Sequence, residues 1–341
     1  MTTIVGLGGG IGASRLWRAL LSSVPPEGVT LVVNTGEDIW MHGLRVCPDL
    51  DTVLYALSGR QDTQRGWGVQ NETWHAMDTL AELGERPWFN LGDRDLAVHL
   101  FRTGRLRDNV PLSHITKQLA EALGIHCRIL PMTDDPVTTR VHTSSGKALH
   151  YQEFLVREHC QPDITEVVYD GAAHARCSDS VLASIRAADI VVIGPSNPVA
   201  SLGPMLALPG MRDTLASVRH RTVVVTPIVE SIPVSDPGEA NRAASRAKLL
   251  AAKGFEPGVV GTAAYYADIA DYFVLDSADS HFTQALHGYG LQVMQADTLL
   301  HLGTNPTPLL DAVLDIPQQF DIPMGRSCGG LHRHGHGKRY G

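Results

Sequence analysis

At 341 residues, the chain is long enough for one large domain or two ordinary ones, and its 43% hydrophobic content excludes global disorder. The formal net charge of −8 argues against a nucleic-acid-binding protein, which needs a basic face. No apolar run approaches the ~18 residues that cross a bilayer, no basic leader precedes the first strand-like segment, and the five cysteines form no CxxC pair. We therefore expect a cytoplasmic protein with reduced thiols that binds neither membranes nor nucleic acids.

Strand-like and helix-like segments alternate in the first 60 residues and again after residue 180. The segments are predicted, in chain order, as a strand at 2–7, a helix at 12–24, a strand at 29–33, a helix at 49–59, a helix at 180–188, a strand at 189–194, a helix at 211–218, a strand at 221–228, a helix at 239–253 and a strand at 271–276. Strands that alternate with helices form parallel sheets with crossover connections. We therefore expect an α/β fold with a doubly wound, mostly parallel, Rossmann-like sheet.

The middle of the chain departs from this alternation. From about residue 60 to 125 the strand pattern gives way to helical periodicity, which predicts a helical insertion beside the sheet. A buried strand at 127–132 follows, and two β-rich runs around a Ser-Ser-Gly segment, within 138–156, predict a β-hairpin. We expect residues 1–323 to form a single α/β domain and residues 324–341, rich in Gly, Arg and His, to form a flexible tail.

Residues 8–12, which we call the glycine loop, follow the first predicted strand and contain Gly8, Gly9, Gly10 and Gly12. With Ala13, the loop satisfies the dinucleotide-binding pattern G-x-G-x-x-G/A between a strand and a helix. Glycine permits the tight turn, and the N–H groups at the start of the following helix attract an anion. However, an NAD enzyme would carry Asp or Glu where this chain has Asn34, and no Gly-Lys-Ser/Thr of a P-loop follows. The loop predicts a phosphate site without naming the ligand.

Four carboxylates lie near the ends of the first two strand–helix units: Glu37, Asp38, Asp49 and Asp51. In a parallel sheet these ends share one edge, where ligands bind. Carboxylates beside a phosphate loop repel the ligand unless a cation intervenes, which favours Mg²⁺. Asp49 could instead only cap the helix that follows. Asp51 has no such role and is the better candidate metal ligand, so Asp51→Ala is expected to abolish turnover and leave the fold intact.

Several further stretches appear in an order that is typical of one enzyme family. They run from residue 6 to about 228, with a weaker match near 276, and read GGGIGASRL, VVNTGEDIWMHGLRVCPDLDTVLYALSG, RGWGVQNETW, WFNLGDRDLAVHLFRTGRLRDNVPLS, ILPMTDDPVTT, HYQEFLVRE, IGPSNPVASLGPMLALPGMRD and VVVTPI. Together they resemble the 2-phospho-L-lactate transferase family of deazaflavin coenzyme biosynthesis. The resemblance implies an Mg²⁺-dependent enzyme, expected to be a homodimer. It would transfer phospholactate, phosphoenolpyruvate or phosphoglycerate from a GDP-linked donor to the ribityl hydroxyl of the deazaflavin Fo, and release GMP.

The resemblance also implies roles for individual residues. The glycine loop would hold the diphosphate. Asp49 and Asp51 would bind Mg²⁺, and one of them would accept the proton of the ribityl hydroxyl. Arg94 would contact a phosphate or carboxylate of the substrate, unless it only belongs to a salt-bridged helix start.

Two further sets of residues are expected to bind the two substrates. Asn34, Ser196 and Asn197 would contact the ribose and base of the guanosine. Trp67 and Trp74 would stack on the deazaflavin ring, with ordinary core packing as the alternative.

The sequence departs from the family pattern at two places. Ile11 replaces a threonine that the family commonly carries, so one hydroxyl is missing from the glycine loop. Glu230, Asp236 and Glu239 lie where the family usually has a neutral, glycine-rich segment, which puts donor recognition there in question. Two other functions remain open alternatives. One is a nucleotide-sugar-binding regulatory protein of the gluconeogenesis-factor family, and the other is a dinucleotide oxidoreductase.

Overall fold

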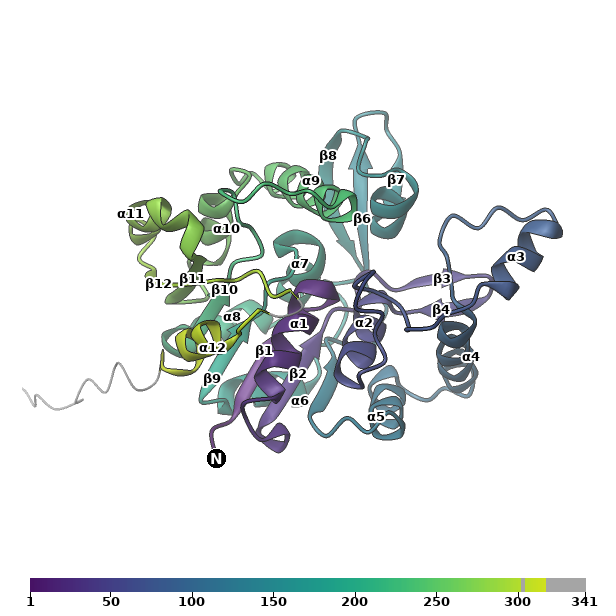
Figure 1. Cartoon of the computed structure of the whole chain (residues 1–341), viewed down its shortest axis with the longest axis horizontal. Helices are drawn as coiled ribbons and strands as arrows, with labels where there is room; N and C mark the ends of the chain where they lie inside the picture. The colour runs from purple at the N-terminus through teal and green to yellow at the C-terminus, as the bar shows by residue number, and fades with distance from the viewer. Residues whose placement is uncertain (302–303, 317–341) are drawn as a thin grey trace, which may run out of the picture.

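The computed structural model describes residues 1–301 and 304–316. Its centre is a sheet of seven parallel strands in the order β12-β11-β10-β9-β1-β2-β5 (Figure 1). The strands are β1 (Ile4–Leu7), β2 (Val29–Val33), β5 (Arg128–Pro131), β9 (Ile190–Ile193), β10 (Thr222–Val225), β11 (Tyr272–Asp276) and β12 (Gln292–Ala296). β1 pairs with β2 on one side and with β9 on the other, so the strand order reverses between β1 and β9. Ligands of such sheets bind beyond the carboxyl ends of the strands at this switch point.

Side chains alternate between two buried faces of the sheet. In β9, Ile190 and Val192 join one core cluster, whereas Val191 and Ile193 join the other. The first cluster includes buried side chains of α1 (Gly10–Leu21), α2 (Pro48–Leu57), α5 (Leu112–Ala122) and α12 (Thr307–Leu314). The second includes buried side chains of α6 (Asp179–Ala187), α8 (Met211–Ser217), α9 (Pro237–Ala252) and α10 (Val259–Tyr266). The sheet is therefore covered by helices on both faces.

The helical insertion contains α3 (His75–Glu82) and α4 (Asp93–Arg107) and ends with α5 beside β5 (Figure 1). A short antiparallel ribbon, β3 (Ile39–Met41) and β4 (Leu44–Val46), precedes the insertion, and α4 packs against it. A second antiparallel sheet, in the order β7-β6-β8, lies beyond the central sheet at the top of Figure 1. Its strands are β6 (Thr138–Thr143), β7 (Ala148–His150) and β8 (Ile164–Asp170). The remaining short helices are η1 (Pro26–Gly28), η2 (Glu153–Arg157), η3 (Pro198–Leu202), α7 (Gly203–Leu206), η4 (Arg219–Arg221), η5 (Ser277–Phe282) and α11 (Thr283–His287).

The predicted fold class is confirmed: the chain has a parallel, doubly wound sheet, an insertion of helices and a β-hairpin formed by β6 and β7. The second half of the expected hairpin ends early, because Glu153–Arg157 forms η2 instead of a strand. The ribbon strands β3 and β4, together with β8 and β12, were not predicted. β8 and β12 lie at sheet edges and expose several side chains, so they lack the continuous apolar run that identifies a central strand.

Three sequence-based expectations concern features outside the sheet. No helix in the described ranges is long and apolar enough to cross a membrane. The four cysteines in those ranges are buried and free, as expected for reduced thiols. The predicted tail at 324–341 and the domain boundary at residue 323 lie outside the described residues.

Candidate active site

The glycine loop connects β1 to α1 at the switch point of the sheet. Gly10 has φ +70°, a backbone conformation that L side chains rarely adopt. Gly9 and Gly12 are required by close contacts instead. A Cβ atom on Gly9 would lie 2.4 Å from Asp49 Oδ2, and one on Gly12 would lie 2.1 Å from the Pro195 carbonyl oxygen. The loop therefore touches the start of α2 on one side and the segment that follows β9 on the other.

Ser196 holds the loop in place. Its Oγ donates a hydrogen bond to the Gly9 carbonyl oxygen at 2.9 Å and accepts one from the Gly9 N–H at 3.1 Å. Asn197 caps η3, because its Oδ1 accepts hydrogen bonds from the N–H groups of Val199 and Ala200, and its Nδ2 donates to the Tyr151 hydroxyl at 3.5 Å. These contacts position the loop and η3. The guanosine contacts expected of Ser196 and Asn197 stay predictions.

Three buried carboxylates, Glu37, Asp38 and Asp49, gather beyond the end of β2, and we call them the carboxylate cluster. Asn34 links two of them, because its Nδ2 donates to Asp49 Oδ2 at 2.9 Å and to Glu37 Oε1 at 3.4 Å. An aspartate at this position could not donate these bonds. Asn34, which argues against an NAD enzyme in the sequence, therefore serves to hold Glu37 and Asp49 together.

Most of the partners of the cluster are neutral. Glu37 accepts hydrogen bonds from Gln152 Nε2 at 2.7 Å and from Ser201 Oγ at 3.1 Å. Asp38 also forms an ion pair, in which its Oδ2 lies 3.3 Å from Arg45 Nη2.

Burial and mutual repulsion raise the pKa values of these groups. Burial, reinforced by the charge of Asp49, raises the pKa of Glu37 well above its usual value. Burial raises the pKa of Asp49 to about 7, although the hydrogen bond from Asn34 opposes the rise. Burial also raises the pKa of Asp38 to about 6 against the attraction of Arg45. The protein therefore stabilises the ionised forms of these carboxylates poorly, and a cation beside the glycine loop would favour them.

Asp51 has different neighbours from Asp49, although both lie in the first turn of α2. Both oxygens of Asp51 accept hydrogen bonds from the guanidinium of Arg102 on α4. The Arg102 side chain is 1% exposed and the Asp51 side chain 6%. His99 lies on the same face of α4 as Arg102, and its Nδ1 is 3.6 Å from Asp51 Oδ2. Asp51 is thus engaged in a buried ion pair between helices, and Asp49 is the carboxylate that faces the glycine loop.

Trp67 and Trp74 lie between α2 and α3, and Arg94 lies in the first turn of α4. Arg94 is exposed, and its Nη1 donates to the Gln70 carbonyl oxygen at 3.2 Å. The rings of Trp67 and Trp74 meet edge to face with centroids 6.5 Å apart, and the Arg65 guanidinium lies 5.1 and 5.3 Å from them. Trp67 is 40% exposed. Their proposed substrate contacts remain predictions.

The three acids that depart from the family pattern have structural partners. Glu230 Oε1 accepts from the Val259 N–H at the start of α10, at 2.7 Å. Asp236 caps α9, because its Oδ1 accepts from the Glu239 N–H at 2.7 Å. Glu239 pairs with Arg242 at 2.8 Å and with Arg246 at 2.6 Å. These acids fix α9 and α10, and each is satisfied by a cap or an ion pair.

Sequence reasoning missed several residues around the site. Arg102 gave no signal, because the sequence of an amphipathic helix does not distinguish a buried arginine from an exposed one unless the partner of the arginine is known.

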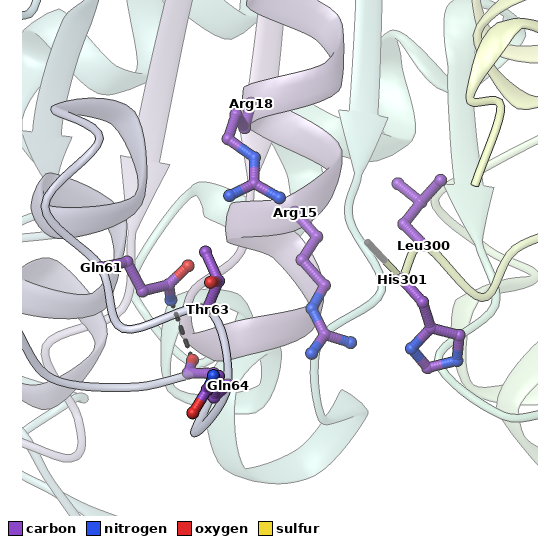
Figure 2. A pocket seen from close by; sticks show the side chains of 8 residues that line it. Arg15, Arg18, Gln61, Thr63, Gln64, Leu300 and His301 are labelled. Carbon is purple, nitrogen blue, oxygen red and sulfur yellow. Dashed lines mark hydrogen bonds between the residues drawn. The ribbon is translucent and has the colours of Figure 1, made fainter. Parts of the chain in front are cut away.

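A pocket beside α1 was also missed, because its residues come from three distant segments (Figure 2). Its lining consists of Arg15, Arg18, Gln61, Thr63, Gln64, Gly66, Leu300 and His301.

Comparisons with known proteins agree with this architecture. A family model described as "2-phospho-L-lactate transferase CofD" matches residues 4–301. A 2-phospho-L-lactate transferase from Methanosarcina acetivorans is 40% identical over 294 residues, which cover 86% of this chain and 92% of the relative. A phosphoenolpyruvate transferase from Kitasatospora aureofaciens is 40% identical over 294 residues, which cover 84% of this chain and 89% of the relative.

A crystal structure of a UPF0052 family protein from Bacillus halodurans aligns with a TM-score of 0.60 at 17% identity, over 92% of this chain and 100% of that chain. At this identity the likeness concerns the fold alone. The family model, in contrast, matches residues 4–301, which contain all seven strands of the central sheet. The alignments with the two sequence relatives cover most of this chain and most of each relative. This chain therefore belongs to the 2-phospho-L-lactate transferase family and is a transferase.

Proposed function

We propose that the protein transfers a three-carbon phospho-acid from a GDP-linked donor to the ribityl hydroxyl of the deazaflavin Fo and releases GMP. The family membership and the names of the two relatives support this type of transfer. The observation that carries the proposal is the contact between the glycine loop and the buried Asp49 at the switch point of the sheet. A loop suited to a diphosphate and a carboxylate suited to a cation are thereby brought together.

The donor set of the site fits Mg²⁺, which prefers carboxylate and phosphate oxygens. The raised pKa values of Glu37 and Asp49 support this assignment, because each carboxylate lies in a negative, desolvated environment that a cation would relieve. Asp49, with Glu37 beside it, would hold the ion. Asp51 is not part of the proposed set, because Arg102 already neutralises it. When bound, Mg²⁺ offsets negative charge on the phosphate oxygens.

The residues of the chain would supply the rest of the chemistry. The N–H groups in the first turn of α1 have no partner within the helix and would bind the diphosphate oxygens. The ribityl oxygen would form a bond to the β-phosphorus, the bond from that phosphorus to the oxygen of GMP would break, and a phosphodiester would result. Either carboxylate of the pair, Asp49 or Glu37, would accept the ribityl proton. We further propose that the protein is a cytoplasmic homodimer, and light scattering of the purified protein tests the dimer.

Product analysis tests the proposed reaction. The protein is incubated with Fo, Mg²⁺ and, in separate reactions, GDP-linked lactate, enolpyruvate or glycerate, and the deazaflavin products are identified by mass spectrometry. We expect one acid to be transferred with an equal amount of GMP released. Asp49→Asn should lose at least about 100-fold in rate, as is usual when a group that stabilises transition-state charge is removed. Asp311→Asn, an exposed change on α12, is the matched control. Absence of both acid transfer and GMP with all three donors contradicts the proposal.

A further inference from the structure

The pocket beside α1 has a volume of about 360 Å³ and is cationic. Figure 2 shows the guanidinium groups of Arg15 and Arg18 in the space between Gln61–Gln64 on one side and Leu300 and His301 on the other. The described residues that line the pocket include no Asp or Glu. Its volume lies in the range of small-ligand sites, and its lining favours an anion.

Among the residues that the structure describes, Arg15 and Arg18 have no partner of opposite charge at contact distance. Neither forms a hydrogen bond or an ion pair with the residues at 1–301 and 304–316. Glu239 lies close enough to influence Arg15, but Arg242 and Arg246 already occupy both of its carboxylate oxygens. Burial, together with the nearby positive charge of Arg242, lowers the pKa of Arg15, which an anion in the pocket would reverse.

The pocket adjoins the glycine loop. A Cβ atom on Gly66 would lie 3.5 Å from Arg15 Nη2 and 3.5 Å from Ile11 Cγ2, so Arg15 and Ile11 flank the same point. Side chains on a helix lean toward its N-terminus, which directs Arg15 toward the first turn of α1. A ligand whose diphosphate lies on that turn can therefore extend into the pocket.

We propose that Arg15 binds the carboxylate of the three-carbon acid in the donor, with Arg18 adding positive charge one helical turn away. The inference rests on the proposed function. Phospholactate, phosphoenolpyruvate and 2-phosphoglycerate all carry a carboxylate next to the carbon that bears the phosphate oxygen, and a guanidinium binds a carboxylate through two parallel hydrogen bonds. The diphosphate itself has the N–H groups of the glycine loop. Thr63 and Gln64 line the same pocket, in which the methyl, methylene or hydroxymethyl group of the acid would also lie.

Binding measurements with three ligands test the proposal. Calorimetric Kd values are measured in Mg²⁺ for GDP, for its β-methyl ester and for GDP-linked lactate, which adds the carboxylate. We expect Arg15→Gln to weaken binding of GDP-linked lactate by about 10- to 100-fold and to change the other two Kd values by less than about twofold. Arg15→Lys keeps the positive charge but loses the bidentate contact, so its Kd for GDP-linked lactate should lie between the values of the wild type and Arg15→Gln. Arg60→Gln removes an exposed arginine that does not line the pocket, and it should bind all three ligands as the wild type does.

Three results would overturn the inference. If Arg15→Gln weakens all three ligands equally, Arg15 binds a phosphate of the nucleotide and not the carboxylate. If the wild type binds GDP-linked lactate no more tightly than the β-methyl ester, the pocket holds no carboxylate. If all three Kd values are unchanged in Arg15→Gln, the pocket takes no part in donor binding. A wild type that binds no guanine nucleotide at all contradicts the proposed function itself, so the two failures are distinguishable.

Discussion

Gly9 is the residue at which the glycine loop and the carboxylate cluster meet. Its φ is compatible with alanine, so the effect of Gly9→Ala comes from the added methyl group, which would lie 2.4 Å from Asp49 Oδ2. We expect Gly9→Ala to displace Asp49 or the loop and to weaken GDP binding in Mg²⁺ by at least about tenfold, the equivalent of one charge-assisted hydrogen bond. Calorimetric Kd values measure this change.

Gly104→Ala is the matched control for this prediction. Gly104 lies inside α4, and a Cβ atom there would meet nothing within 4 Å. The free energy of unfolding should rise by about 0.5–1 kcal/mol, because alanine favours the helix, and GDP binding should not change. Normal GDP binding by Gly9→Ala would show that the contact with Asp49 is not needed.

The raised pKa of Asp49 predicts a pH dependence of stability in the metal-free protein. The carboxyl group titrates near pH 4 in the unfolded chain and at about 7 in the folded protein. Folding therefore favours the protonated form, and the stability that Asp49 contributes is complete below pH 4 and lost as the pH rises through 7. We expect the Tm in EDTA to fall between pH 5 and pH 8 in the wild type and to fall less in Asp49→Asn. Parallel curves for the two proteins, recorded by scanning calorimetry, would contradict the pKa shift.

At the scale of helices, the Asp51–Arg102 pair joins α2 of the central fold to α4 of the insertion. Both side chains are buried, so the loss of one partner leaves the other charge without compensation. We expect Asp51→Asn or Arg102→Met to lower the free energy of unfolding by about 3 kcal/mol or more in urea denaturation. The exposed pair Lys117–Glu121 on α5 is the control, and Lys117→Met should cost less than about 0.5 kcal/mol.

This prediction differs from the one drawn from the sequence, in which Asp51→Ala leaves the fold intact. The sequence places Asp49 and Asp51 two residues apart in one helix but gives no sign that a residue 51 positions further on pairs with one of them. An Asp51 variant that keeps wild-type stability and loses Mg²⁺-dependent activity would restore the metal role.

The elements themselves were largely predictable, for a physical reason. Buried strands such as β9 and β10 consist of consecutive β-branched and apolar residues, and the insertion helices repeat their apolar positions with helical spacing. β12 and β8 lack such a signal because they are only partly buried. The strand order follows from packing between distant segments, which no local pattern contains.

At the scale of the whole molecule, the site combines segments that local patterns identify and contacts that they do not. The glycine loop and the start of α2 were found from their motifs, because glycine at a tight turn and paired acids are recognisable in isolation. Glu37 was noticed only as one of four acids, and its contacts with Gln152 and Ser201 come from segments more than 110 residues away. Arg15 lies in the quoted stretch GGGIGASRL, but the sequence assigned it no role. The parts of the site that depend on the tertiary fold thus had to come from the structure.

Ligand-induced stabilisation distinguishes the three functions that the sequence left open, because a ligand that binds only the folded state raises its stability. At a concentration 100 times its Kd, a ligand adds about 2.7 kcal/mol, which raises the Tm of a protein of this size by several degrees. We expect GDP with Mg²⁺ to produce such a rise, and UDP-sugars, NAD and NADP at equal concentration to produce none. GDP in EDTA should give a smaller shift, since no cation would then bridge the diphosphate and the carboxylate cluster. A rise with UDP-sugars alone would favour the nucleotide-sugar-binding protein, and a rise with NAD or NADP alone would favour the oxidoreductase. Gly9→Ala is the internal control: binding that is about tenfold weaker should roughly halve the shift with GDP, and an undiminished shift would again show that the contact with Asp49 is not needed.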